Sequence, residues 1–151
     1  MNVLEKVNEC LEKYHGGEIF FDELDKMLKF DEETLKNFMR VVGIETWIHN
    51  QYTIASGEFG LCIHNYCLDV DIIVQGGLRN GNAILDLSKF VVPGHRYLFL
   101  DDSYFSGATA EVVKKEVERC GGIFDGCYVI YDGSKEPIHN VKSIYRYYDH
   151  H

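Results

Sequence analysis

The sequence predicts an α/β fold, in which a parallel twisted sheet is flanked by helices and preceded by N-terminal helices and a β-hairpin. Three short apolar runs, at residues 70–74, 97–100 and 127–131, are typical of strands buried on both faces. Residues 80–89 and 107–120, which separate these runs, have the character of helices. The resulting β–α–β–α–β order implies a parallel sheet with right-handed crossovers.

The length and composition are those of one globular domain. The chain has 151 residues, of which 46% are hydrophobic and 26% charged. We expect a single domain over residues 1–151, with the N-terminal helices and the hairpin in residues 1–69 and the core β–α–β–α–β unit in residues 70–133.

The charge of the chain excludes one class of partner and leaves another open. The formal net charge is −9 and no basic run is present. Non-specific nucleic-acid binding depends on Lys and Arg that neutralise phosphates, so we expect no nucleic-acid partner. A phosphorylated small molecule remains compatible with this acidity, because backbone N–H groups and a helix N-terminus can hold it.

The sequence also predicts a cytoplasmic protein with no membrane partner. No apolar run approaches the roughly 20 residues that span a bilayer. The start of the chain has early acidic residues and no apolar stretch of the kind found in signal peptides. The five cysteines are an odd number, and we expect them to be reduced.

Helical patterns dominate the first part of the chain. Residues 2–14 predict an amphipathic helix and residues 21–29 a short one. Asp31 has the properties of an N-cap, and Gly43 those of the residue that ends the helix which Asp31 opens. The predicted apolar face of that helix consists of Leu35, Phe38, Met39 and Val42.

Strand patterns follow. Residues 45–54 and 59–64 are rich in β-formers and predict the hairpin, whereas Pro93-Gly94 predicts a turn. Residues 143–148 predict an edge strand. Because ligands of open parallel sheets lie beyond the carboxyl ends of the strands, the loops at Gly76-Gly77 and Asp101-Asp102 should line one crevice.

The segment from Tyr97 to Thr109 carries the clearest chemical signal. Four apolar strand residues lead to Asp101 and Asp102, and a short loop then reaches Ser106-Gly107-Ala108-Thr109 at the start of a helix. The loop and the first helical turn present unpaired N–H groups that suit a phosphate dianion. Gly107 permits close approach, and two carboxylates beside the loop can accept bonds from sugar hydroxyls, directly or through Mg²⁺.

This segment resembles, at every position, the phosphoribosyl pyrophosphate (PRPP) motif of the type I phosphoribosyltransferases. The motif consists of apolar residues, two acids, three variable residues and then Thr/Ser-Gly-x-Thr. The resemblance implies a type I phosphoribosyltransferase-like fold that binds PRPP or a nucleoside 5′-phosphate. It assigns catalytic and indirect Mg²⁺-binding roles to Asp101 and Asp102, and phosphate binding to Phe105, Ser106, Gly107, Ala108 and Thr109.

A second segment is similar to the pyrophosphate loop of the same family. A strand ends at Gln75, and Gly76-Gly77 and Arg79 follow it. By the resemblance, Gln75, Gly76, Gly77 and Arg79 would approach the pyrophosphate. Family members commonly form dimers, so the resemblance also makes a homodimer possible.

One departure from the family pattern leaves the function open between three hypotheses. Family enzymes insert a further strand and a long catalytic loop before the motif strand, whereas the predicted elements leave only Leu87 to Arg96 for it. The first hypothesis is a Mg²⁺-dependent enzyme that transfers phosphoribosyl to a nitrogenous base and releases pyrophosphate. The second is a regulator that binds the ligand without turnover, and the third is a protein-interaction module that binds no nucleotide.

Other patterns have simpler explanations. Receiver domains also place paired acids after an apolar strand, but they lack a glycine-containing phosphate loop. Cys62 and Cys67 are a weak zinc signal and are better explained as buried thiols in a strand. Tyrosines in residues 145–148 favour edge-strand packing or a dimer contact over base stacking. We expect a solvated helix face made of Glu111, Lys114, Lys115, Glu116 and Glu118.

Overall fold

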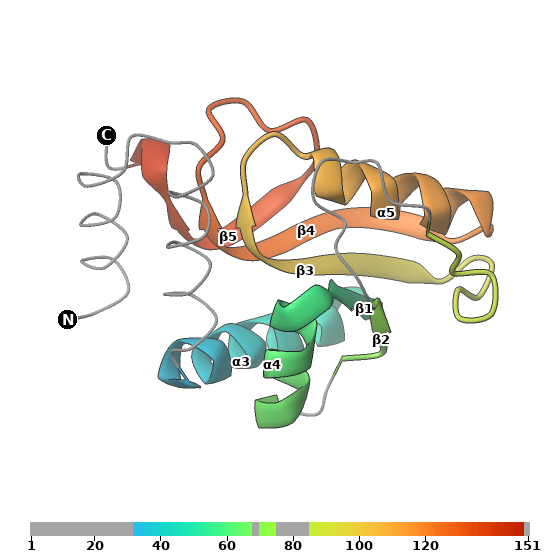
Figure 1. Cartoon of the computed structure of the whole chain (residues 1–151), viewed down its shortest axis with the longest axis horizontal. Helices are drawn as coiled ribbons and strands as arrows, with labels where there is room; N and C mark the ends of the chain where they lie inside the picture. The colour runs from blue at the N-terminus through green and yellow to red at the C-terminus, as the bar shows by residue number, and fades with distance from the viewer. Residues whose placement is uncertain (1–31, 68–69, 75–84, 150–151) are drawn as a thin grey trace.

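The structure is a computed structural model that describes residues 32–67, 70–74 and 85–149 (Figure 1). Its centre is a five-stranded sheet in the order β2-β1-β3-β4-β5, and every neighbouring pair is parallel. The strands are β1 (Gln51–Ser56), β2 (Ile72–Val74), β3 (Arg96–Tyr104), β4 (Ile123–Asp132) and β5 (Val141–Arg146). The predicted α/β class and parallel sheet are confirmed.

Helices cover both faces of the sheet. Figure 1 shows α3 (Glu32–His49) and α4 (Gly57–Cys67) on one face and α5 (Ala108–Arg119) on the other, and the 3-10 helix η2 (Tyr147–Asp149) follows β5. The predicted helices over residues 2–14 and 21–29 and the Asp31 cap lie outside the described residues.

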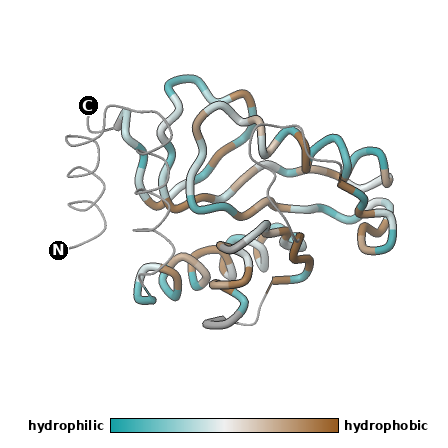
Figure 2. The backbone as a smooth tube through the Cα atoms, in the orientation of Figure 1, coloured by the Kyte–Doolittle hydropathy of each residue, from teal (hydrophilic) through white to brown (hydrophobic). Residues whose placement is uncertain are grey.

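The core has two parts because the sheet is buried on both sides. Leu98 and Leu100 of β3 pack with α3 and α4, whereas Tyr97 and Phe99 alternate to the α5 side. The α3 residues of the first part are those predicted, namely Leu35, Phe38, Met39 and Val42. Ala110, Val113 and Val117 of α5 are also buried as expected. In Figure 2 the teal of hydrophilic residues gathers on the outer turns of α5 and in the loop before β5.

The end of α3 was predicted wrongly. The helix continues through Gly43 to His49, although glycine inside a helix costs about 0.5–1 kcal/mol relative to alanine. In the turns after Gly43, Glu45 forms an ion pair with Lys142 of β5. The residue that leaves the helical conformation is Asn50, with φ of 52°, a left-handed geometry that asparagine tolerates at helix ends.

The β-hairpin is also wrong. Residues 45–49 belong to α3, and residues 59–64 lie within α4. Phe59 and Ile63 are buried at a spacing of four residues while Leu61 is 49% exposed, a pattern of period 3.6 instead of 2. Strand β1 pairs in parallel with β2 and β3 instead of turning back on itself.

The connection that leads into β3 is irregular. Residues 85–90 form no helix, so the predicted helix over residues 80–89 is wrong in its described part, whereas Pro93-Gly94 forms the expected turn. The backbone N–H of Leu87 donates to Glu116 Oε1 at 3.0 Å. Glu116 is only 7% exposed and therefore does not belong to the predicted solvated face. Residues 75–95 lie between β2 and β3, and their described part, residues 85–95, contains no helix or strand.

Strand β5 is an edge strand as predicted, but it covers Val141–Arg146 instead of residues 143–148, and Tyr147 and Tyr148 lie in η2. Tyr145 is buried and stacks on Tyr131 with ring centroids 5.4 Å apart. Cys62 lies in helix α4, not in a strand, and is half-buried. No group of three or more His, Cys, Asp or Glu side chains in the described residues is arranged for a metal ion.

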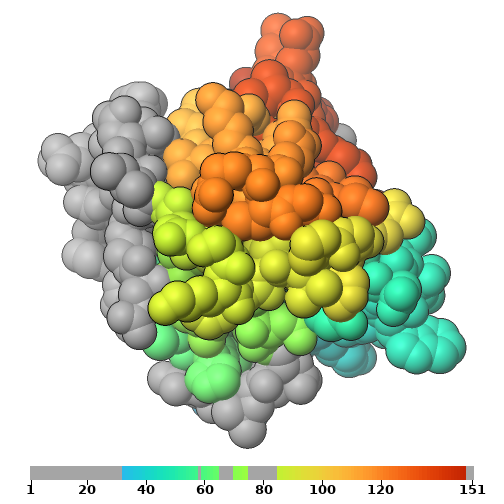
Figure 3. Space-filling model, turned by 90° about the vertical axis from the view of Figure 1, so that its right-hand side faces the viewer, coloured from blue at the N-terminus to red at the C-terminus, as the bar shows by residue number. Residues whose placement is uncertain are grey.

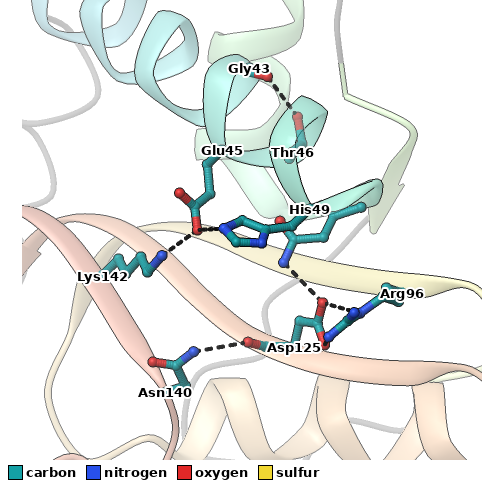
Figure 4. A network of polar contacts seen from close by, with 9 residues as sticks. Gly43, Glu45, Thr46, His49, Arg96, Asp125, Asn140 and Lys142 are labelled. Carbon is teal, nitrogen blue, oxygen red and sulfur yellow. Dashed lines mark hydrogen bonds and ion pairs between the residues drawn. The ribbon is translucent and has the colours of Figure 1, made fainter.

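Polar contacts connect neighbouring strands at the edge of the sheet where the strands begin (Figure 4). Asp125 of β4 accepts bonds from Arg96 Nε at 2.8 Å and from Gln51 Nε2 at 2.9 Å. Arg96 and Gln51 are the first residues of β3 and β1. Figure 3 looks onto this edge, where residues 85–95 fill the middle of the face and the end of α3 lies at the lower right. This network therefore lies at the edge opposite the carboxyl ends of the strands.

Candidate ligand site at the carboxyl edge of the sheet

The two predicted acids lie in the last part of β3. The strand extends to Tyr104, so Asp101 pairs with Val129 of β4 and Tyr104 with Asp132. The acids were expected to follow the strand, but backbone pairing with β4 continues past them. Asp102 is 6% exposed, and Asp101 is half-buried.

The backbone fixes both carboxylates. Asp101 Oδ1 accepts the N–H of Asp102 at 2.8 Å, and Asp102 Oδ1 accepts the N–H of Ser103 at 2.9 Å. Phe99 and Tyr104 pack in the same core cluster although they are five positions apart, an odd spacing that places side chains on opposite faces of a regular strand. The alternation of β3 is therefore interrupted near its end, and both carboxylates accept short bonds from the backbone N–H groups that follow them.

The turn from Phe105 to Gly107 joins β3 to α5. Gly107 has φ of 84°, in the left-handed region that favours glycine, and α5 begins at the next residue. The N–H of Ala108 donates to Ser106 Oγ at 3.3 Å, and the N–H of Glu111 closes the first helical bond to Gly107 O at 2.9 Å. The N–H groups at the start of a helix have no partner within it, so this turn can receive an anion.

Phe105 has a packing role. A Cβ on Gly133 would collide with the Phe105 ring, and the ring lies 5.8 Å from that of Tyr131. The side chain of Phe105 thus anchors the turn to the end of β4, and only its backbone could take part in phosphate binding. Ser106 is exposed, whereas Ala108 and Thr109 are partly exposed.

A chain of three polar groups supports the turn, and nothing in the sequence signalled it: Tyr104 and the side chain of His139 are buried, whereas the side chain of Glu111 is 33% exposed. Tyr104 Oη lies 2.7 Å from His139 Nδ1, and His139 Nε2 lies 2.6 Å from Glu111 Oε2. The bond from His139 lowers the pKa of Glu111, and burial raises the pKa of Tyr104. Glu111 was predicted to lie on a solvated face, but its carboxylate is engaged in this chain.

The topology also identifies a neighbour that sequence reasoning missed. Because β1 lies between β2 and β3, the carboxyl end of β1 is the one beside Asp101 and Asp102. There the chain passes from Ser56 to Gly57, with φ of 61°, and directly into α4. Ala55 of β1 pairs with Leu100, so the start of α4 lies beside Asp101, three residues before the end of β3.

The predicted pyrophosphate residues Gln75, Gly76, Gly77 and Arg79 lie outside the described residues. The described strand β2 ends at Val74, immediately before them, at the same carboxyl edge of the sheet. One strand, β1, separates β2 from β3. The role of Gln75, Gly76, Gly77 and Arg79 in binding pyrophosphate stays a prediction.

The donor set suits a magnesium ion that a ligand brings with it. Mg²⁺ prefers oxygen ligands and in phosphate sites commonly takes one or two carboxylates, with phosphate oxygens and water completing its shell. Asp101 and Asp102 offer carboxylate oxygens, and the described residues hold no larger cluster of metal ligands. These oxygens are of the kind that an ion bound with a phosphorylated ligand would need, and the magnesium role of the two acids stays a prediction.

No helix in the described ranges is both long and apolar enough to cross a membrane. No protein-family profile matches the chain. Its fold is similar to that of adenine phosphoribosyltransferase from Thermoanaerobacter pseudethanolicus, with a TM-score of 0.59 and 16% sequence identity over 81% of this chain and 86% of that one. The adenine phosphoribosyltransferase from Rhodothermus marinus gives a TM-score of 0.56 and 17% identity, over 80% of this chain and 83% of that one. The chain thus has the type I phosphoribosyltransferase-like fold that the motif implied.

Proposed function

We propose that this chain binds PRPP or a nucleoside 5′-phosphate at the carboxyl edge of its sheet. Residues 105–109 bind the 5′-phosphate, and Asp101 and Asp102 bind the ribose hydroxyls. The observation that carries the proposal is the left-handed turn at Gly107, which opens α5 five residues after Asp102.

The phosphate half of the proposal is supported by the geometry of the turn. Helix α5 is 12 residues long and carries a partial positive charge at its N-terminus. Gly107 supplies the left-handed backbone that opens the helix, and Ser106 and Thr109 bring hydroxyl donors to the same turn. These groups favour an anion even though the chain as a whole has a net charge of −9.

The ribose half is supported by the carboxylates. A carboxylate accepts hydrogen bonds readily from vicinal hydroxyl groups. Backbone bonds already fix Asp101 and Asp102, so little side-chain entropy is lost when a ligand binds. Magnesium, when bound with the ligand, would neutralise phosphate charge beside these residues.

The reaction that suits such a site is transfer of phosphoribosyl from PRPP to a nitrogenous base. In that reaction the bond from C1′ of the ribose to pyrophosphate breaks, and a bond from C1′ to a ring nitrogen forms. The carboxylates of Asp101 and Asp102 would stabilise the positive charge that develops on the ribose. The Ser56–Gly57 junction at the start of α4 is a second group of backbone donors that the leaving pyrophosphate could meet.

Binding is tested by removing the two carboxylate charges. Asp101→Asn with Asp102→Asn should weaken PRPP binding at least a hundredfold in calorimetric titration with Mg²⁺, since each lost charged hydrogen bond contributes about 1.5–3 kcal/mol. The matched control, Asp86→Asn with Glu118→Gln, removes two exposed charges outside the site. Equal affinity of wild type and the aspartate variant would refute the assignment.

Turnover is tested separately by pyrophosphate release from PRPP with a panel of purine and pyrimidine bases. Release with one base class would establish a phosphoribosyltransferase and identify its acceptor. Tight PRPP binding without release for any base would favour a regulator with the same fold. Absence of binding would leave the protein-interaction alternative.

A further inference from the structure

We propose that His139 is a positioning residue that holds the 105–109 turn in its ligand-binding conformation and makes this binding depend on the loop at residues 133–140. The inference rests on the proposed function, because it concerns the same turn. It assigns a role to a residue that lies 35 positions after Tyr104 and belongs to neither of the two motif segments.

The imidazole of His139 joins three separate elements. Its side chain is 2% exposed and lies between Tyr104 at the end of β3 and Glu111 in the first turn of α5. A neutral ring with the proton on Nε2 satisfies both contacts, because Nε2–H donates to the Glu111 carboxylate and Nδ1 accepts from the Tyr104 hydroxyl. The ring also meets the edge of Phe124, with centroids 5.9 Å apart.

The imidazole ring of His139 packs against the Gly107 turn. A Cβ placed on Gly107 would lie 2.6 Å from Tyr104 Oη and 3.1 Å from His139 Nδ1. The backbone of Gly107 therefore packs directly on the Tyr104–His139 contact. Loss of the imidazole would leave the Tyr104 hydroxyl without this partner and the turn without support on that side.

His139 also binds the carboxylate of Glu111, whose negative charge would repel a phosphate group. Glu111 lies two residues after Thr109, at the helix end that is proposed to receive phosphate. The groups that act on its carboxylate are His139, through a hydrogen bond, and the charged side chains of Lys114 and Lys115. Among them, His139 makes the direct contact, at 2.6 Å. The imidazole N–H therefore holds the carboxylate at the side of the helix and satisfies it there.

The loop that carries His139 is anchored at both ends. Near its start, Gly133 N–H donates to Tyr104 O at 2.9 Å, and Arg146 Nη2 donates to Ser134 O at 3.2 Å. Near its end, Cys127 N–H donates to Asn140 O at 2.8 Å. Because β3, β4 and β5 hold the backbone of this loop, the side chain of His139 can keep the 105–109 turn in place.

The test compares His139→Leu, His139→Gln and Tyr104→Phe with wild type. Two properties are measured: PRPP affinity by calorimetry with Mg²⁺, and hydrogen exchange of the amides of residues 106–110 in the ligand-free protein. His139→Leu should weaken PRPP binding by about tenfold or more, as expected for the loss of a buried hydrogen bond, and should speed exchange. His139→Gln, whose amide can still donate to Glu111, should recover part of both properties. Tyr104→Phe keeps the ring volume and should fall between these variants.

Two control variants separate positioning from general destabilisation. His95→Leu removes a histidine that stacks on Tyr52, beside the first residue of β3, and should leave affinity unchanged. Val117→Ala makes a cavity at the far end of α5 and should lower stability without weakening the binding of PRPP. If Val117→Ala and His139→Leu lowered the free energy of unfolding equally and weakened PRPP binding equally, the positioning role would be refuted.

The outcomes also distinguish this inference from the proposed function. If the wild type binds PRPP and both His139→Leu and Tyr104→Phe bind within twofold of it, the inference is wrong and the proposed function stands. If the wild type binds no PRPP, the proposed function fails, and the exchange measurement still decides whether His139 holds the turn. Unchanged exchange in both variants would then overturn the inference as well.

Discussion

Gly107 is the residue on which the candidate site most depends. It combines φ of 84° with a space in which a Cβ would lie 2.6 Å from Tyr104 Oη. We predict that Gly107→Ala lowers the free energy of unfolding by about 1–3 kcal/mol from the backbone conformation alone, and further through the clash. Urea denaturation measures this loss.

The chain contains a matched control for that substitution. Gly94 has the same φ of 84°, but a Cβ added there would meet no atom within 4 Å. Gly94→Ala should therefore show the conformational cost without the clash, and it should leave PRPP binding intact. Equal effects of the two substitutions would mean that the packing of Gly107 on Tyr104 is not important.

Glu116 gives a prediction about pH. Its side chain is 8% exposed and accepts bonds from Arg119 and from the backbone of Leu87, and the Arg119 bond lowers its pKa below 4.5. A carboxyl whose pKa is lower in the folded state stabilises the fold above the unfolded value, and this contribution is lost as the pH falls through the folded value. Glu116→Gln should therefore cost about 1–3 kcal/mol at pH 7, and the difference from wild type should shrink below about pH 4.

The measurement is the free energy of unfolding as a function of pH for wild type and variant. Glu118→Gln on the exposed face of the same helix is the control and should change stability by less than about 0.5 kcal/mol. A difference between Glu116→Gln and wild type that stayed constant from pH 7 to pH 3 would contradict the proposed pKa.

The turn that joins β3 to α5 was predicted correctly because its signal is local, whereas the ligand roles of its residues stay a prediction. Asp101, Asp102 and Gly107 lie within one short segment, and their spacing alone indicated the turn. His139 could not be found in this way, since its partners Tyr104 and Glu111 come close to it only through the pairing of β3 with β4. Glu116 was misplaced because the helical pattern does not reveal that the 85–95 connection lies over that turn of α5.

Helix α4 is the element whose prediction failed most clearly, and its burial pattern is testable. Ile63 is fully buried and Leu61 is 49% exposed, whereas in a strand residues two apart would share a face. Ile63→Ala should therefore cost about 2–5 kcal/mol, as large-to-small core substitutions do. Leu61→Ala should cost less than about 0.5 kcal/mol, as surface substitutions do. Denaturant unfolding with both variants checks the contrast, and similar costs would support the strand instead.

The failure has a physical cause. Residues 59–64 are rich in apolar residues, and the periodicity of so short a run does not separate a buried strand from a helix. Packing decided the outcome, since Phe59 and Ile63 reach α3 and the sheet only from a helix. Helix α3 likewise continues past the local end signal at Gly43, and Glu45 in its later turns forms an ion pair with Lys142 of β5.

At the scale of the whole molecule, the parallel sheet brings the proposed ligand groups to one edge. The ends of β1 and β3 are adjacent, so Gly57 and Gly107 open two helices beside the same pair of strands. The sequence predicted parallel strands and a carboxyl-edge site, because these follow from the alternation of elements. It did not predict that β1 lies between β2 and β3, because strand order depends on pairing between distant segments.

The measurement that tests the central claim most directly is thermal unfolding of the wild-type chain with and without PRPP, with Mg²⁺ present throughout. PRPP at 100 times its dissociation constant should stabilise the fold by about 2.7 kcal/mol. For a domain of this size that corresponds to a rise of roughly 2–8 °C in the unfolding midpoint. Such a rise, absent in the Asp101→Asn, Asp102→Asn variant, is the predicted result. An unchanged midpoint with PRPP and with every nucleoside monophosphate would contradict a phosphoribosyl site on this fold.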